Sequence, residues 1–170
     1  MTRTLFVLGG ARSGKSAYAQ ARCEALGRRL VYIATAEAGD DEMAERIARH
    51  RADRGECWST LEAPLDLPGA IAHAALRADA VLVDCLTLWL SNLMLGGHDP
   101  APARTALALS IEKLQVPLVL IANEVGLGIV PDNALARRFR DEAGRLNQHV
   151  AAVAAEVVLM VAGLPVQVKG

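Results

Sequence analysis

Short runs of apolar residues recur along the chain, separated by longer segments in which apolar and polar positions are mixed. The runs cover residues 5–8, 30–34, 80–83, 118–122 and 157–161. A run of this length that is apolar throughout is typical of a strand buried on both faces. Strands of this kind with helices between them predict an α/β fold, in which a mainly parallel sheet is flanked by helices.

The segments between the runs have the spacing and the end signals of helices. They span residues 14–26, 40–54, 86–95, 101–114 and 132–155. Gly27 is expected to cap the first helix, and a glycine-punctuated loop at 123–131 precedes the last. A final extended piece covers residues 165–168. Because no repeat or linker interrupts this order, residues 1–170 are expected to form a single domain.

Composition and charge narrow the classes of function. Apolar residues make up 52% of the chain, which argues against wholesale disorder, and the net charge is -1. Because basic and acidic side chains nearly balance, the chain has no overall electrostatic field to attract nucleic acid or an anionic membrane. Neither partner is therefore expected. No apolar run approaches the ~20 residues of a membrane span, and the first run is too short for a signal peptide. Cys23, Cys57 and Cys85 are widely spaced, as is typical of reduced thiols in a cytoplasmic protein.

The strand at 5–8 leads into the motif G-x-x-x-x-G-K-[ST], at the start of the first predicted helix. Its members are Gly9, Gly10, Ala11, Arg12, Ser13, Gly14, Lys15 and Ser16. Glycines let the backbone wrap a phosphate with several N–H groups pointing inward, and the helix N-terminus adds positive potential. Lys15 is expected to reach the β- and γ-phosphates of a nucleotide, and Ser16 to ligate Mg²⁺. The alternative is a glycine turn with an exposed lysine, but the strand-to-helix context favours a P-loop NTPase.

Asp84 directly follows the apolar run at 80–83. A carboxylate at this place in a P-loop protein organises Mg²⁺, so Asp84 and Ser16 are candidate metal ligands. The alternative is that Asp84 caps the helix predicted from residue 86 onward. The chain contains no N-K-x-D motif for reading guanine, which disfavours a regulatory GTPase and leaves the choice of base open.

The charged segment at 40–54 places Arg46, His50 and Arg54 on one face of the predicted helix, at i, i+4 and i+8. A histidine among guanidinium groups is expected to stay neutral and nucleophilic near neutral pH, and the arginines can bind a polyphosphate. His50 is therefore a candidate for attack on an α-phosphorus. The alternative is a solvated face, because pairs such as Glu42–Arg46 are ordinary i,i+4 contacts.

Seven segments together resemble one family of enzymes. They read GGARSGKS (9–16), YIAT (32–35), DDEMAERIARHR (40–51), WSTLEAP (58–64), NEVGLGIVP (123–131), RFRDEAGRLNQ (138–148) and GLPVQVK (163–169). In this order they are similar to the bifunctional adenosylcobinamide kinase/adenosylcobinamide-phosphate guanylyltransferases of cobalamin biosynthesis. The chain departs from the family at residues 96–102, where relatives can carry a longer connection. That departure concerns local packing rather than activity.

The resemblance implies two reactions on one acceptor. The family phosphorylates adenosylcobinamide, with ATP or GTP as donor, and then transfers GMP from GTP to adenosylcobinamide phosphate, which gives adenosylcobinamide-GDP. The guanylyl group passes through a phosphoramidate on a histidine, which corresponds to His50, while Lys15 is the second catalytic candidate. Outside the phosphate loop, the residues that match GTP-binding positions are Ala34, Thr35, Ala36, Arg51, Ala52, Asp53, Arg54, Glu62 and Asp84. The resemblance also implies a RecA-like P-loop fold and a homotrimer.

Two other functions stay open on the residues alone. A plain small-molecule kinase would use the phosphate loop, with His50 as a bystander. A nucleotide-dependent switch or regulatory ATPase would need no small-molecule acceptor at all. The glycine-rich loop at 123–131 is either a moving substrate clamp or a plain turn.

Overall fold

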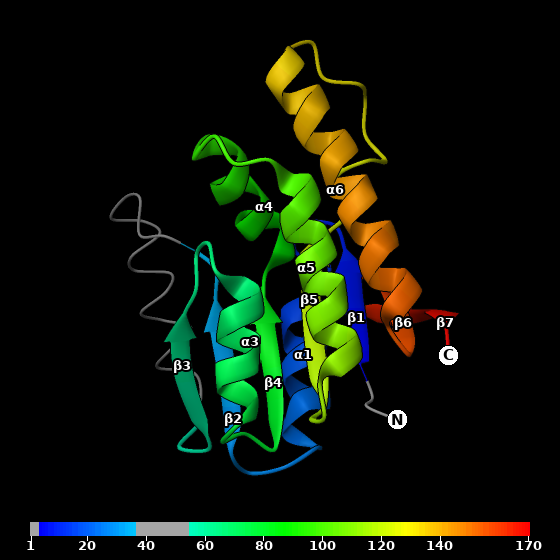
Figure 1. The fold of residues 1–170 in the computed structure, drawn as a ribbon. Helices are drawn as coiled ribbons and strands as arrows, with labels where there is room; N and C mark the ends of the chain where they lie inside the picture. Colours follow the sequence, from blue (N-terminus) through cyan, green and yellow to red (C-terminus); the bar gives the residue numbers. More distant parts are fainter. Residues whose placement is uncertain (1–3, 37–54) are drawn as a thin grey trace.

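The computed structural model describes residues 4–36 and 55–170, whose strands form one seven-stranded sheet (Figure 1). The strands are β1 (Thr4–Gly9), β2 (Leu30–Ala34), β3 (Trp58–Glu62), β4 (Ala80–Asp84), β5 (Leu118–Asn123), β6 (Glu156–Val161) and β7 (Leu164–Lys169). Their order across the sheet is β3-β2-β4-β5-β1-β6-β7. Neighbouring strands from β3 to β6 are parallel, and β7 is antiparallel to β6. The carboxyl ends of the parallel strands therefore meet at one edge.

Helices cover both faces of this sheet. They are α1 (Lys15–Glu24), α3 (Leu67–Ala75), α4 (Leu86–Leu95), α5 (Pro100–Lys113) and α6 (Ala134–Val153). Figure 1 shows α3, α5 and α6 in front of the strands and α1 behind them. Among the described helices, none combines the length and the apolar character that a membrane span requires.

The core lies in two layers, one on each face of the sheet. Phe6 is fully buried with the side chains of α3 to α6, whereas its neighbours Leu5 and Val7 pack with Ala19 and Cys23 of α1. Successive side chains of a strand point to opposite faces, so a strand covered on both sides must be apolar at every position. This is the physical reason for the apolar runs in the sequence.

Most of the predicted elements are confirmed. Each of the five predicted strands lies within an observed strand, and the extended piece at 165–168 lies within β7. Four predicted helices correspond to α1, α4, α5 and α6, with ends that differ by at most two residues. The helix predicted at 40–54 lies outside the described residues.

Two elements, β3 and α3, were not predicted. The β3 sequence, WSTLE, is not an apolar run, because β3 is an edge strand and none of its side chains is fully buried. The α3 helix is short and carries a proline and a glycine in its first turn. Its start is set by Asp66, whose side chain accepts a hydrogen bond from Gly69 N.

The prediction that Gly27 caps α1 is wrong, because the helix ends earlier and its C-cap is Ala25. Gly27 is required for a different reason: a Cβ on it would lie 2.3 Å from the Cβ of Asp79.

Side-chain and backbone hydrogen bonds from Arg29, with another from Arg28 N, lower the pKa of the Asp79 carboxyl to about 2. Any stability this carboxylate contributes is present above its ordinary pKa of 3.8 and is lost as the pH falls through about 2.

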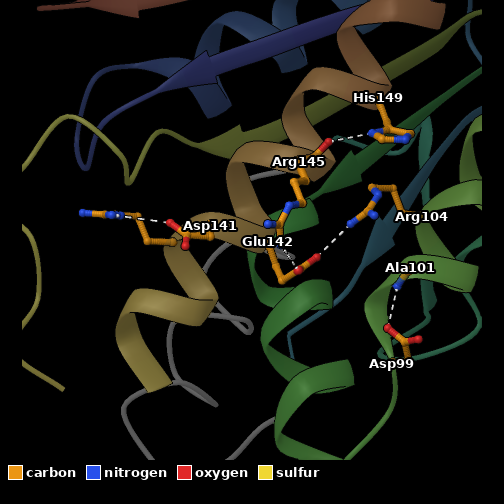
Figure 2. Close-up of polar contacts among 8 residues, drawn as sticks. Asp99, Ala101, Arg104, Asp141, Glu142, Arg145 and His149 are labelled. Atoms are coloured by element: carbon orange, nitrogen blue, oxygen red, sulfur yellow. Dashed lines mark hydrogen bonds and ion pairs between the residues drawn. The ribbon is translucent and has the colours of Figure 1, made fainter. Parts of the chain in front are cut away.

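The long helix α6 is joined to α5 by a small ion cluster (Figure 2). The Nη1 atom of Arg104 lies 2.8 Å from Oε2 of Glu142, and the two side chains are only 13% and 14% exposed. Glu142 also pairs with Arg145 through its other oxygen. Because both of its oxygens are paired, the Glu142 carboxylate fixes α6 against α5. The loop that follows β5 leads directly into α6.

We expect two glycine substitutions to change stability in opposite directions. Gly27→Ala forces the α1–β2 turn away from Asp79 and should lower the free energy of unfolding by ~1–3 kcal/mol. Gly144→Ala, in α6, meets no atom within 4 Å and should raise it by up to ~1 kcal/mol, because alanine favours a helix. Urea denaturation of both variants tests this, and a stable Gly27→Ala protein would contradict the contact with Asp79.

Candidate nucleotide-binding site

The backbone between β1 and α1 forms a loop that requires glycine at its two ends. Gly14, the N-cap of α1, has a φ of 89°, in the left-handed region where a side chain is strained. A Cβ on Gly9 would lie 2.3 Å from Ser13 Oγ and 3.1 Å from the backbone oxygen of Met160. Glycine is therefore required at position 9 because neighbouring atoms lie too close for a side chain, and at position 14 because of the backbone conformation.

Lys15 is the first residue of α1, and its side chain folds back over the loop. Its Nζ donates a hydrogen bond of 2.9 Å to the carbonyl oxygen of Gly10. The first backbone N–H groups of a helix have no partner within the helix, and its N-terminus carries partial positive charge. A phosphate bound here would meet an ammonium group and these N–H groups together, so the loop has the chemistry of an anion site.

Asp84 lies beside this loop, at the end of β4. Its Oδ2 accepts hydrogen bonds from Ser16 Oγ at 3.4 Å and from Tyr32 Oη at 3.0 Å. The alternative that Asp84 caps α4 is not supported: the N-cap of that helix is Cys85, and no side chain caps it. Asp84 is thus brought to the phosphate loop across the intervening strand β5.

A metal ion at this place would have few protein ligands. Within residues 4–36 and 55–170, no group of three His, Cys, Asp or Glu side chains could hold an ion. What the site offers is one carboxylate and one hydroxyl, from Asp84 and Ser16, next to a phosphate cradle. Mg²⁺ prefers such oxygen ligands and is commonly held by one or two carboxylates together with substrate phosphates. These residues therefore fit Mg²⁺.

The segment after β2 is held to β4 by the buried side chain of Thr35. Its Oγ1 donates to the carbonyl oxygen of Cys85 at 2.7 Å and accepts from Cys85 N at 2.8 Å. Asn92 of α4 adds two more links, because its Nδ2 donates to Thr35 O at 2.8 Å and to Pro64 O at 3.1 Å. The ends of β2, β3 and β4 are thus locked together by polar contacts from two side chains.

The described candidate residues gather at the carboxyl edge of the sheet. Ala34 pairs with Glu62 on β3 and with Asp84 on β4, and Thr35 and Ala36 follow it. In open α/β sheets this edge is where ligands bind. His50 and the residues 51–54 lie outside the described residues, so their position relative to this edge stays a prediction.

Some residues at the site were not found from the sequence. The turn between β6 and β7 supports the phosphate loop, because Gly163 N donates to Ser13 O at 3.0 Å and Gly163 has a φ of 81°. Tyr32 and Asn92 were also given no role. Tyr32 lies in the segment YIAT (32–35) and Gly163 in GLPVQVK (163–169), so the resemblance pointed to these segments, whereas Asn92 belongs to no motif. The partner of Gly163 lies about 150 residues away in the chain, so the sequence gave no sign of their contact.

Comparison with known proteins agrees with this geometry. The family model described as "Cobinamide kinase / cobinamide phosphate guanyltransferase" matches residues 5–168. The chain belongs to this family. It is 48% identical over 167 residues to the bifunctional adenosylcobalamin biosynthesis protein CobP of Pseudomonas aeruginosa, covering 96% of each chain. It is 42% identical over 180 residues to the bifunctional adenosylcobalamin biosynthesis protein CobU of Salmonella typhimurium, covering 97% of this chain and 99% of that protein.

The fold is shared with a more distant group. A solved structure described as "Structural and biochemical analysis of a prototypical ATPase from the type III secretion system of pathogenic bacteria" superposes with a TM-score of 0.57 at 12% identity. The match covers 92% of this chain and 50% of that one. It confirms the predicted α/β fold, a mostly parallel sheet flanked by helices as in a P-loop ATPase.

Thr35 offers a test of how the site is held together. Thr35→Val keeps the shape of the side chain but leaves the N–H of Cys85 without its partner and the C=O of Cys85 with only the N–H of Trp89, so the free energy of unfolding should fall by ~1–3 kcal/mol. GTP affinity should weaken as well, since the segment after β2 loses its side-chain link to Cys85. Thr35→Ser keeps the hydroxyl and is the matched control. Equal stability and GTP binding of the two variants, by urea denaturation and calorimetry, would argue against this role.

Proposed function

We propose that this protein phosphorylates adenosylcobinamide and then transfers GMP from GTP to the product, which gives adenosylcobinamide-GDP for cobalamin biosynthesis. The observation that carries the proposal is the contact of Ser16 in the phosphate loop with Asp84, in a chain of the cobinamide kinase/guanyltransferase family. Three relatives at 41–48% identity are bifunctional adenosylcobalamin biosynthesis proteins, which supports the same pathway.

In the kinase step, the phosphate loop would hold the triphosphate of ATP or GTP. The backbone N–H groups of residues 12–15 and the ammonium group of Lys15 would bind the β- and γ-phosphates. These groups are set in place by the loop before the nucleotide arrives, so they stabilise charge as it develops on the leaving diphosphate without reorganising. Lys15 is therefore proposed as catalytic in this step.

Ser16 and Asp84 would hold Mg²⁺, because they bring a hydroxyl and a carboxylate oxygen within 3.4 Å of each other at the phosphate loop. Tyr32 would orient the carboxylate, since its hydroxyl donates to the same Oδ2 atom. When bound, the ion would neutralise negative charge on the phosphate oxygens.

In the transferase step, His50 would be the nucleophile. Its imidazole nitrogen forms a bond to the α-phosphorus of GTP, and the bond to pyrophosphate breaks. A phosphate oxygen of adenosylcobinamide phosphate then attacks the same phosphorus, and the P–N bond breaks as the imidazole leaves. Two in-line displacements give retention of configuration at phosphorus. The segments 34–36 and 51–54, with Glu62 and Asp84, would bind the nucleotide during both displacements.

We propose a cytoplasmic, single-domain chain that assembles as a homotrimer. The three cysteines are free thiols, which is compatible with a reducing compartment. Burial raises the pKa of the Cys23 thiol to about 12 and that of the Cys85 thiol to about 11, so both thiols stay protonated near neutral pH. An edge strand with exposed apolar side chains, as in β7 with Leu164 and Val168, is commonly covered by another chain. The trimer itself is proposed from the family resemblance.

The Mg²⁺ assignment predicts a specific defect for Asp84→Asn. The amide keeps the size of the side chain and can still accept hydrogen bonds, but it lacks the negative charge that attracts a cation. The Mg²⁺ concentration for half-maximal kinase rate should rise, and the maximal rate should fall. Tyr32→Phe is the control: it removes one hydrogen bond from Asp84 and should shift the Mg²⁺ dependence much less. An unchanged Mg²⁺ dependence in Asp84→Asn would leave Asp84 with a structural role.

The His50 assignment predicts that the two activities separate. His50→Ala should eliminate GMP transfer and protein labelling by GTP radiolabelled at the α-phosphate, because no other route to the covalent intermediate exists. Kinase activity should persist, since phosphorylation of a hydroxyl needs no protein nucleophile, and the phosphorylated corrinoid should accumulate. Mass spectrometry of the products measures both outcomes.

His73→Ala, at an exposed position of α3, is the matched control and should retain both activities. Normal GMP transfer by His50→Ala would place the nucleophile elsewhere, and loss of both activities would make His50 structural or shared. A protein that never becomes labelled, yet phosphorylates the corrinoid, would be a plain kinase. Nucleotide hydrolysis without any transfer to the corrinoid would indicate a regulatory ATPase.

A further inference from the structure

A cavity of about 610 Å³ adjoins the phosphate loop on the side away from the candidate nucleotide-binding segments. It is bordered by residues 10–13 of the loop, by residues 124–128 after β5, and by residues 159–162 at the end of β6. The described nucleotide-binding candidates outside the loop, 34–36, Glu62 and Asp84, lie at the carboxyl ends of β2, β3 and β4, on the other side of β1 in the sheet order. The phosphate loop therefore lies between these two regions.

The lining of this cavity is suited to an uncharged organic group. Most of its side chains are apolar, and two of them are charged, Arg12 and Glu124. Its volume lies in the range of ~300–1,000 Å³ that is usual for small-molecule sites. A cavity with an apolar wall and a few convergent polar groups is typical of a substrate site.

Glu124 is held at the mouth of the phosphate loop by its own backbone. Its N–H donates to the carbonyl oxygen of Gly9 at 3.0 Å, which continues the pairing of β5 with β1 by one residue. One carboxylate oxygen, Oε1, accepts a hydrogen bond from Gly126 N. That contact holds the carboxylate within the loop after β5, and Glu124 borders the cavity together with residues 10–13.

We propose that this cavity receives the alcohol-bearing arm of the acceptor and that Glu124 is the general base of the kinase step. The inference deepens the proposed function and rests on it. The acceptor is larger than the cavity, so its corrin ring would lie outside, against the exposed apolar side chains of Leu127 and Ile129. Those residues belong to the loop at 123–131, which thereby has a role in substrate binding rather than that of a plain turn.

In the proposed kinase step, one bond to phosphorus forms as another breaks, and the proton passes to Glu124. The hydroxyl oxygen of the acceptor forms a bond to the γ-phosphorus, and the bond between that phosphorus and the bridging oxygen breaks. The nucleoside diphosphate leaves with the electron pair, and the hydroxyl proton passes to the Glu124 carboxylate. In the transferase step the acceptor is already a phosphate ester with no hydroxyl proton to remove at the reacting oxygen, so Glu124 has no part in it.

Glu124→Gln separates this role from a structural one. The amide oxygen can still accept the hydrogen bond from Gly126 N, but the side chain cannot take up a proton. With adenosylcobinamide as acceptor, kcat of the kinase step should fall by ~10²–10⁴-fold. With adenosylcobinamide phosphate as acceptor, GMP transfer should stay within about twofold of the wild-type rate. Asp132→Asn, a carboxylate loss at an exposed position just after the loop at 123–131, should leave both rates unchanged.

A kinase rate near wild type in Glu124→Gln, or a parallel loss of both activities, would overturn the proposal. A wild-type protein that cannot phosphorylate the corrinoid would overturn the proposed function and this inference together. A wild-type protein that does phosphorylate it, beside either of those results for Glu124→Gln, would overturn this inference alone.

A second variant tests the cavity itself. Val125 lines it, and Val125→Trp should raise the KM for adenosylcobinamide at least tenfold by occupying the space of the arm. The dissociation constant of GTP should change by less than about twofold, because the nucleotide segments lie on the other side of the loop. An unchanged KM for the corrinoid would show that the acceptor binds elsewhere.

Discussion

The site depends on how tightly the backbone turns between β1 and α1. Gly9 leaves no room for a side chain beside Ser13, and Gly14 adopts a left-handed conformation at the start of the helix. The turn is supported from outside by Gly163, whose N–H binds the carbonyl oxygen of Ser13. Because this backbone is held in place before any ligand binds, the N–H groups and Lys15 can face a phosphate without reorganisation.

A second constraint comes from the carboxyl ends of the parallel strands. Parallel pairing brings Ala34 beside both Glu62 and Asp84, although these residues are far apart in the sequence. Polar contacts from Thr35 and Asn92 then lock the segments after β2 and β3 to β4 and α4. The same edge thus provides a rigid base on which a nucleotide can extend from the phosphate loop toward β3.

This arrangement suits a chain of the cobinamide kinase/guanyltransferase family, because in the proposed scheme both reactions use the same phosphate loop. Both reactions displace a phosphate leaving group, so both benefit from the same loop. In the proposed scheme they differ in their nucleophile: an alcohol would need a base, whereas GMP transfer would use the His50 imidazole. Among the described residues, the candidates Ala34, Glu62 and Asp84 lie on the β4–β2–β3 side and Glu124 on the β5–β1–β6 side.

The sequence by itself determined the elements that depend on local pattern. Strands buried on both faces must be apolar, so five strands were predicted, and the spacing of Gly9, Gly14, Lys15 and Ser16 identified the phosphate loop. The edge strand β3 and the short helix α3 were missed, because partial exposure and brevity leave no clear pattern. Sequence also left open whether Asp84 caps a helix or faces the loop, and only the tertiary structure brought it to Ser16. The contacts of Tyr32, Asn92, Glu124 and Gly163 were decided by the fold as well, since strand order, and not position in the chain, determines which residues meet at the carboxyl edge.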